Sequence, residues 1–459
     1  MGDERMGVSR RTILRGASAL PFLTGNFALP ALAQAAPAAS TTGDIPPMLF
    51  VHGNGDQAAL WITTLWRMES NGVPREKMFA INFTDPLARN DDAVAQPGRS
   101  STEDQRRALA EAIAALKRRT GAARVALVGN SRGGNSIRSF IKNGGSGDVS
   151  HAVLCGVPNH GVYAWDDNPG SEFNGRGPFL RSLNEGESEV TPGIAFLTLR
   201  SDGLDKFAQP DGRFVGKPGV ATNITAEGPA LKGATNLMLG PVDHRETAYS
   251  SRAFREIFKF IAGREPERLE IVPEKHVKLS GLVTGTPGGV QTNRPVAGAT
   301  VEVFRVASDT GERIGAVIHT SQTGESGRWG PAEVDPSWPL EIVLTSSDQP
   351  ITHFYRSPFP PPPTSCICAP RGRSVRPTPA QAPWCCCRGR AAISGCRATW
   401  CCSTARSRPT SNRACRQIRS RHCGCRLLTL VATSQACSTK SGSWRGPGLL
   451  PKAGLRSRN

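Results

Sequence analysis

The sequence predicts an α/β domain with a mainly parallel sheet over residues 46–265, followed by a small β-sandwich module over residues 270–356. The first prediction rests on short apolar runs that alternate with amphipathic stretches, the pattern of strands joined by crossover helices. The second rests on a change after Arg268 to a period of two residues with glycine and proline turns. Neither pattern continues past residue 356, so we expect no fold for residues 357–459.

Within the first domain, apolar runs bounded by turn residues mark the expected strands. The clearest helix covers Ser101–Thr120, where the apolar residues fall on one face. Ser100 and Glu103 have the spacing of a capping box at its start, and Gly121 ends it. We expect strands of the sheet at residues 48–51, 78–83, 125–128, 151–157, 194–199 and 235–239, a closing helix at 248–261, and strands of the module at 278–283, 299–304 and 342–344.

The periodicity fails between residues 158 and 191. This segment is rich in Gly, Asn, Pro and Ser, yet it carries apolar side chains that include Tyr163 and Trp165. A long excursion from a compact domain is usually functional or disordered. Two interpretations stay open, a lid-like insertion that covers substrate and a structural surface loop.

The net charge of +18 would ordinarily favour a nucleic-acid or anionic-membrane partner. Residues 357–459, however, contain 16 Arg and two Lys and no acidic residue, so the rest of the chain holds 38 basic and 38 acidic groups. The body of the protein is therefore neutral, and we expect no nucleic-acid partner.

The cysteines divide the chain at the same place, because 12 of the 13 lie between Cys366 and Cys437. Their spacing matches neither a zinc site nor a recognisable disulfide framework. The interpretations are a disordered basic tail, an unusual metal or disulfide module, and out-of-frame translation of a GC-rich gene. We favour the last interpretation, with a frame slip in the codons for Pro360–Pro363. We assign the tail no function. Resequencing of the gene that confirms the reading frame would contradict this hypothesis.

Residues 1–35 have the three parts of an export signal. The Arg10-Arg11 pair precedes a mildly apolar run at residues 17–31, and Ala33 and Ala35 offer a cleavage site. The run is weaker than a membrane span, which needs ~20 strongly apolar residues, and no second long apolar segment follows. Paired arginines are typical of the twin-arginine type. We expect a periplasmic or secreted protein without a transmembrane segment.

A G-x-S-x-G motif at residues 129–133 carries the expected nucleophile. It follows the strand at 125–128 and leads into a helix through Ile141. At such a turn, small flanking residues permit a strained backbone that exposes the serine hydroxyl, and the start of the helix favours negative charge. We predict that Ser131 is the nucleophile.

The acid and the histidine should follow such a serine in the sequence, in that order. His244 comes after the last expected strand and before the closing helix, so we predict it as the base, whereas His52 precedes the serine and is expected to be structural. The loop after the strand at 194–199 offers two acids. We prefer Asp205, and Asp202 remains the alternative.

The loops after the first strand and after the nucleophile should supply the remaining parts of the site. The backbone amides of Asn54 and Arg132 are the expected oxyanion donors. Trp61, Leu65 and Trp66 follow the first of these loops, and they line an acyl site or pack in the core.

Together these motifs resemble the secreted bacterial triacylglycerol lipases of the class 2 type, in the α/β-hydrolase superfamily. The resemblance covers residues 47–262 through His52-Gly53, the motif at 129–133, residues 157–161, the Asp205 loop and Asp243-His244. It implies the α/β-hydrolase fold, ester hydrolysis without a cofactor or metal, Asp205 as the acid, and an oxyanion hole at Asn54 and Arg132. Some of these lipases carry a carboxyl-terminal β module thought to help acyl chains bind, which implies contact with a lipid interface. The insertion at 158–191 is longer than in the smallest members.

The predicted function is that of an exported lipase or esterase that forms an acyl-enzyme on Ser131. The alternatives are a depolymerase of polyhydroxyalkanoate-type polyesters, a short-chain esterase, and a non-catalytic surface-binding protein with an inert hydrolase domain. The expected partner is an ester or lipid substrate.

Overall fold

The computed structural model describes residues 45–347, 349–359 and 428–429. Its amino-terminal domain is built on a six-stranded sheet with the order β2-β1-β5-β6-β7-β8, in which every neighbouring pair is parallel. This confirms the predicted parallel sheet. The strands are β1 (Met48–Val51), β2 (Met78–Ala80), β5 (Val125–Asn130), β6 (Val149–Cys155), β7 (Ala195–Arg200) and β8 (Thr235–Met238), and the short strands β3 (Leu87–Ala88) and β4 (Arg99–Ser100) pair separately.

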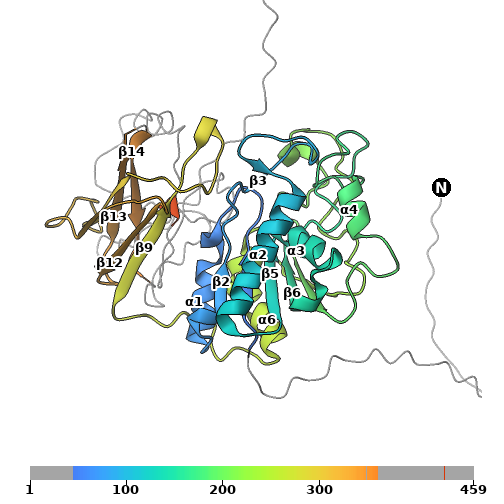
Figure 1. Cartoon of the computed structure of the whole chain (residues 1–459), viewed down its shortest axis with the longest axis horizontal. Helices are drawn as coiled ribbons and strands as arrows, with labels where there is room; N and C mark the ends of the chain where they lie inside the picture. Colours follow the sequence, from blue (N-terminus) through green and yellow to red (C-terminus); the bar gives the residue numbers. More distant parts are fainter. Residues whose placement is uncertain (1–44, 348, 360–427, 430–459) are drawn as a thin grey trace, which may run out of the picture. The chain divides into compact units, whose positions relative to one another are not determined.

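Helices cover both faces of this sheet, and α2 and α3 lie over β5 and β6 in Figure 1. Successive strand residues point to opposite layers, so Leu49 packs in the core beneath α2 and α3 whereas Phe50 packs in the core that includes α1 and α6. The helices are α1 (Ile62–Ser70), α2 (Thr102–Thr120), α3 (Arg132–Lys142), α4 (Pro178–Leu183), α5 (Glu246–Tyr249) and α6 (Ser251–Ala262), with 3₁₀ turns at Ala58–Trp61, Arg75–Lys77, Gly145–Asp148, Gly212–Val215 and Pro287–Gly289.

The capping box at the start of α2 lies one residue later than predicted. Ser101 caps the helix, because its hydroxyl accepts a hydrogen bond from the Asp104 amide while the Asp104 carboxylate accepts one from the Ser101 amide. Ser100 instead belongs to β4 and donates its hydroxyl to the Asp85 carbonyl at 2.7 Å. The prediction of Ser100 with Glu103 was wrong because both serines precede an acidic residue at the required spacing.

Two other predicted elements are shorter or divided. The strand predicted at 78–83 ends at Ala80, after which the Phe83 amide donates to His52 Nε2 at 3.1 Å rather than to a neighbouring strand. The closing helix is divided at Ser250, which has extended backbone angles and accepts a hydrogen bond from the Ala253 amide. Ser250 therefore starts α6 as a new helix.

The order of strands in the sheet fixes where a ligand should bind. From β1 the chain proceeds outward to β2, and it then returns to β5, on the other side of β1, and continues outward to β8. Open parallel sheets bind ligands beyond the carboxyl ends of the strands at such a reversal. The loops after β1 and β5, which begin at His52 and Ser131, meet at this point.

The second part of the structure is a β-sandwich of antiparallel strands, as predicted. One sheet has the order β11-β10-β13-β14 and the other has the order β12-β9-β15. Alternate residues of β9, β10 and β13 form its apolar core, in which Phe359 is also buried. The strands are β9 (Val277–Val283), β10 (Thr300–Arg305), β11 (His319–Gln322), β12 (Arg328–Val334), β13 (Leu340–Ser346), β14 (Gln349–Arg356) and β15 (Leu428–Thr429).

Strand β15 belongs to the segment for which the sequence predicted no fold, and its two residues pair with β9. The expected export signal at residues 1–35 lies outside the described residues. Apart from β15, so do the residues beyond 359. Within the part of the chain that the structure describes, no helix has the length and apolar character needed to cross a bilayer.

Candidate active site

The backbone at Ser131, the predicted nucleophile, has an unusual conformation. Ser131 has φ +54° and ψ −127° at the junction of β5 and α3, a conformation that residues other than glycine rarely adopt. The neighbouring glycines leave no room for side chains, since a methyl group at Gly129 would lie 2.6 Å from Ile137 and one at Gly133 would lie 2.5 Å from the His52 carbonyl. The G-x-S-x-G pattern is thus required by close packing of the turn against α3 and the end of β1.

The predicted base and acid contact one another. His244 Nδ1 lies 2.8 Å from Asp205 Oδ2, and their residues are 7% and 2% exposed. The ring of Phe207 packs edge-on against the imidazole, with 4.7 Å between ring centres. This arrangement fixes the orientation of the ring and leaves Nε2 as its other nitrogen for proton transfer.

The surroundings of Asp205 favour its ionised form. Its second oxygen, Oδ1, accepts a hydrogen bond from the Phe207 amide at 2.8 Å, and Oδ2 also accepts one from the Ser201 hydroxyl at 2.6 Å. Burial alone would raise the pKa of Asp205, but the nearby His244 and these hydrogen bonds outweigh burial and lower its pKa. A carboxylate held in this state can stabilise an imidazolium ion.

The alternative acid, Asp202, has a different place in the same loop. Its carboxylate accepts a hydrogen bond from the Leu204 amide at 3.0 Å, and its carbonyl accepts one from the Asp205 amide at 3.0 Å. Asp202 therefore shapes the turn that presents Asp205 to His244.

Sequence reasoning missed Asn130, a residue that joins the turn at Ser131 to the loop that carries His244. Asn130 is 1% exposed, and its side-chain amide donates to the carbonyls of Cys155 and His244 at 2.9 and 3.2 Å. It also lies 3.3 Å from the Thr247 hydroxyl. Because Asn130 immediately precedes Ser131, these hydrogen bonds join the Ser131 turn to the loop that carries His244. The sequence did contain a signal for this residue. Asn130 is a polar amide inside the motif, at a position of a buried strand where an apolar side chain would be expected.

The loop after β1 lies directly beside Ser131. A methyl group added at Gly53 would lie only 2.8 Å from the Ser131 Cβ atom. Asn54, the next residue, accepts a hydrogen bond from the Ala88 amide through its side-chain oxygen at 2.7 Å. The two residues predicted to supply oxyanion donors, Asn54 and Arg132, therefore flank Ser131 from the ends of two adjacent strands.

The oxyanion prediction concerns the backbone amide of Arg132, whereas its side chain is fully buried and makes other contacts. It forms an ion pair of 2.6 Å with Glu172, which is 3% exposed, and donates to the Ser100 carbonyl at 2.8 Å. Glu172 belongs to the segment at 158–191. Burial raises the pKa of Glu172, and the opposing charge of Arg132 offsets only part of that increase.

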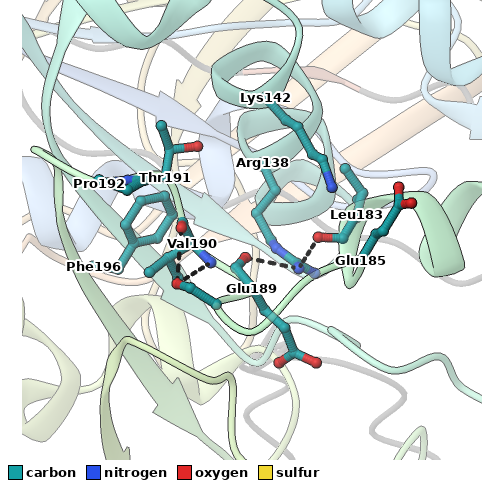
Figure 2. Close-up of a pocket in the computed structure, with 10 residues that line it drawn as sticks. Arg138, Lys142, Leu183, Glu185, Glu189, Val190, Thr191, Pro192 and Phe196 are labelled. Atoms are coloured by element: carbon teal, nitrogen blue, oxygen red, sulfur yellow. Dashed lines mark hydrogen bonds between the residues drawn. The ribbon is translucent and has the colours of Figure 1, made fainter.

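Arg138 makes a second attachment between α3 and the same segment. Its guanidinium donates to the carbonyls of Leu183 and Glu189 at 3.2 and 3.3 Å (Figure 2). Burial lowers the pKa of Arg138 to about 10, which leaves it charged at neutral pH. Two buried arginines of α3, the helix that begins after Ser131, thus attach the segment at 158–191 to the α/β domain.

Arg138 and Glu189 also line a cavity of about 210 Å³, together with Lys142, Glu185 and Phe196 among others (Figure 2). None of Ser131, Asp205 and His244 lines this cavity. It lies beside the attachment of the segment and is separate from the candidate catalytic residues.

The three apolar residues considered for an acyl site lie in cores. Trp61 and Leu65 are 0% and 5% exposed and pack in the core that includes α1 and α6. Trp66 is 9% exposed and packs in the core of the β-sandwich. Their positions match the core-packing alternative. An aromatic cluster that includes Tyr163 and Trp165 of the 158–191 segment lies near His244, because it packs with Phe207, which contacts the His244 ring.

Comparison with known proteins gives two family matches. Residues 46–160 match the family described as lipase (class 2), and residues 275–364 match the lipase C-terminal domain. No curated protein matches the chain.

Solved structures similar to the chain include three bacterial enzymes. The mature form of the Bacillus licheniformis lipase BlEst2 is 20% identical, with 50% of this chain and 96% of that chain covered and a TM-score of 0.34. Phospholipase PlaB from Legionella pneumophila is 13% identical, with coverage of 69% and 90% and a TM-score of 0.32. Carboxylesterase CesB from Bacillus subtilis is 13% identical, with coverage of 48% and 85% and a TM-score of 0.26. Residues 46–160 thus match the class 2 lipases and residues 275–364 match the lipase C-terminal domain, and together these two matches support a carboxylic ester hydrolase with the α/β-hydrolase fold.

Proposed function

We propose that the protein is an exported lipase or esterase that cleaves carboxylic esters through an acyl-enzyme on Ser131. The observation that carries this proposal is the 2.8 Å contact between His244 and Asp205, in a loop that Asn130 ties to the strained turn of Ser131. A serine, an imidazole and a buried carboxylate in this relation are the parts of a serine hydrolase triad.

In the proposed reaction, His244 Nε2 removes the proton of the Ser131 hydroxyl as its oxygen attacks the ester carbonyl carbon. The carbonyl oxygen becomes an oxyanion, which the backbone amides of Asn54 and Arg132 stabilise, each by about 3 kcal/mol. Collapse of this intermediate expels the alcohol, which takes its proton from His244. Water, deprotonated by the same histidine, then attacks the acyl carbon and releases the acid.

Asp205 keeps its negative charge through both steps and stabilises the protonated imidazole. The lowered pKa of Asp205 supports this role, because the carboxylate stays ionised well into acid pH. The mechanism needs no cofactor or metal.

The proposed substrate is an ester of a fatty acid, presented at a lipid surface. Leu204, next to Asp205, is 63% exposed, and Phe214 farther along the same loop is 52% exposed. Large apolar side chains exposed beside an active site favour contact with lipid. Rates on p-nitrophenyl esters of increasing acyl length, measured beside a polyester-film assay, separate a lipase from a short-chain esterase and from a depolymerase.

Export through residues 1–35 is the remaining part of the proposal. Replacing Arg10 and Arg11 by Lys should keep the protein in the cytoplasm, because the paired arginines are the recognised feature of this signal. Cell fractionation checks this result, and unchanged export of the variant would contradict a twin-arginine signal.

The catalytic assignment is tested by comparing Asp205→Asn with Asp202→Asn. Loss of the true acid leaves histidine in the wrong tautomer, so Asp205→Asn should lower kcat by about 10⁴. Asp202→Asn should retain activity within about tenfold, because Asp202 acts only on the shape of the loop. The reverse order of the two variants would contradict the proposal, as would activity that survives Ser131→Ala.

A further inference from the structure

A short segment of the β-sandwich lies against the loop that follows β1. This segment, residues 291–293, is called the strap. Its Gln291 side-chain amide donates to the Gly55 carbonyl at 3.0 Å. Its Asn293 side-chain amide donates to the Asp56 carbonyl at 3.0 Å, across 237 residues of sequence. The strap therefore contacts the two residues that directly follow Asn54, a proposed oxyanion donor.

The Asn293 contacts are buried and multiple. Asn293 is 4% exposed. Its side-chain amide also donates to the Phe83 carbonyl at 2.9 Å, and its backbone amide donates to the Thr84 carbonyl at 2.8 Å. Hydrogen bonds shielded from water fix backbone positions more firmly than exposed ones, because an unmade buried bond leaves polar groups without a partner.

The strap is itself fixed within the β-sandwich. Thr292, which is fully buried, donates its hydroxyl to the Gly285 carbonyl at 2.8 Å and accepts a hydrogen bond from the Arg294 amide at 3.3 Å. A rigid β-sandwich thus presents two side-chain amides to the loop after β1.

That loop is partly held within its own domain, where the Gly55 amide donates to the Pro86 carbonyl at 2.9 Å, and the strap adds further hydrogen bonds. Gly55 has φ +62°, and Gly53 has no side chain that could anchor the loop by packing. Glycine-rich backbone has the most conformational freedom to lose. An oxyanion donor must nevertheless be placed within about 0.5 Å to stabilise the transition state.

The same contact reaches the histidine loop through Asp56. The Asp56 carboxylate pairs with Arg245 at 2.9 Å, and Arg245 directly follows His244. Asp56 and Arg245 are 7% and 6% exposed, so this pair is also shielded from water. Asn293 therefore supports a residue that joins the oxyanion loop to the loop of the base.

Other contacts, which do not involve the strap, also join the α/β domain to the β-sandwich. Ile62 and Trp66 of the α/β domain pack in the apolar core of the β-sandwich. Arg294, beside the strap, pairs with Asp85 at 2.7 Å and is 52% exposed. These contacts join the domains without touching residues 53–56, whereas the strap contacts the carbonyls of that loop.

We propose that Gln291 and Asn293 of the β-sandwich are positioning residues that hold the oxyanion loop in its catalytic geometry. The β-sandwich then contributes to the rate of the chemical step, in addition to any contact that it makes with lipid. This inference rests on the proposed function, since it assumes that Asn54 stabilises an oxyanion.

The test compares Gln291→Ala and Asn293→Ala with the matched control Arg294→Ala, all in the full-length chain. Each strap variant should lower kcat on a soluble p-nitrophenyl ester about tenfold, the effect of one misplaced or lost hydrogen bond, with KM within about twofold. Arg294→Ala should keep the wild-type kcat, because its ion pair is exposed.

A second readout separates positioning from general loosening of the structure. An alkyl trifluoromethyl ketone takes the Ser131 oxygen at its carbonyl carbon, while the serine proton moves to His244 and the ketone oxygen becomes an oxyanion. Its inhibition constant should rise by about the same factor as kcat/KM falls, since both depend on the oxyanion donors. Titration with a fluorophosphonate counts the folded sites in each sample, so the rates refer to intact enzyme.

Strap variants with wild-type kcat and inhibition constant would overturn the inference. A raised KM with unchanged kcat would also overturn it, because the module would then act on substrate binding. If Asn293→Ala does not fold, Gln291→Ala decides, since Gln291 is only partly buried. Wild-type protein that neither hydrolyses the ester nor reacts with the fluorophosphonate would refute the proposed function itself, a result distinct from inactive variants of an active enzyme.

Discussion

Two segments remote from Ser131 in sequence are attached to its surroundings, and the two attachments differ in chemistry. The segment at 158–191 is held to α3, the helix that begins after Ser131, by the buried ion pair between Glu172 and Arg132. The strap is held to the oxyanion loop by neutral amides that donate to backbone carbonyls. The charged attachment leaves a buried charge uncompensated when either partner is removed, and it responds to pH. The neutral attachment spreads smaller contributions over several hydrogen bonds and places backbone atoms.

The largest expected effect comes from leaving a buried charge without its partner. Arg132→Ala should lower the free energy of unfolding by about 3 to 5 kcal/mol, because Glu172 would stay buried and uncompensated. The double variant Arg132→Met with Glu172→Leu should recover most of that loss. Urea unfolding measures both, and a loss below about 1 kcal/mol for Arg132→Ala would show that the pair contributes little.

Removal of a buried neutral hydrogen-bonding side chain should lower the unfolding free energy by less than removal of one partner of the buried ion pair. Asn130→Ala deletes an amide that donates to the His244 and Cys155 carbonyls, so we expect a loss of about 1 to 3 kcal/mol in unfolding free energy. Activity should fall as well, because the base is no longer held at a fixed distance from the serine. Asn143→Ala is the control, since that amide donates to the Ser139 carbonyl at the far end of α3. Equal activity of the two variants would argue against a positioning role for Asn130.

The two attachments should also differ in their response to pH. The pKa of Glu172 is raised above its ordinary value of 4.5 in the folded protein, so the folded state binds this proton more tightly than the unfolded chain does. Its contribution to stability is therefore complete below pH 4.5 and declines as the pH rises through the folded pKa. The stability of wild type relative to Glu172→Gln should shrink as the pH is raised from 4.5 towards neutrality.

Asn293→Ala provides the matched comparison, because no titrating group is removed and its stability difference from wild type should stay constant over the same range. Unfolding curves at several pH values check both statements. If the difference for Glu172→Gln instead grew with pH, folding would lower the pKa of Glu172, and the attraction of Arg132 would outweigh the cost of burial.

The smallest effect on the unfolding free energy is expected for a solvent-exposed ion pair. Arg106 and Glu103 lie 2.7 Å apart on the surface of α2. Arg106→Ala should change the unfolding free energy by no more than about 0.5 kcal/mol, and salt should screen even that. A loss comparable to that of Arg132→Ala would mean that burial is not what distinguishes the two pairs.

The sequence predicted the parts of the site that depend on local pattern. Ser131 was predicted as the nucleophile because a strand, a glycine-flanked turn and a helix follow one another within a few residues, and His244 as the base because of its position between the last strand and the last helix; both roles stay predictions. The sequence left both Asp202 and Asp205 open as partners of the histidine. Both acids lie in one short turn, and only the fold shows which carboxylate faces the imidazole.

Other features depend on contacts that no local pattern reports. Trp66 is apolar and lies on a helix, but the sequence does not reveal that its partner is the core of the β-sandwich rather than an acyl chain. The pairing of Arg132 with Glu172 and of Asn293 with Asp56 spans separate elements, so neither could be read from spacing. The capping box was misplaced by one residue because two adjacent serines satisfied the same rule.

The most direct measurement is to trap the acyl-enzyme analogue and locate it. Wild-type protein treated with a fluorophosphonate and digested should carry the phosphonyl group on the peptide that contains Ser131, and Ser131→Ala should carry none. Asp205→Asn should react far more slowly, and Asp202→Asn close to the wild-type rate. An adduct on another residue, or wild-type protein that stays unmodified, would contradict the assignment of Ser131 as the nucleophile.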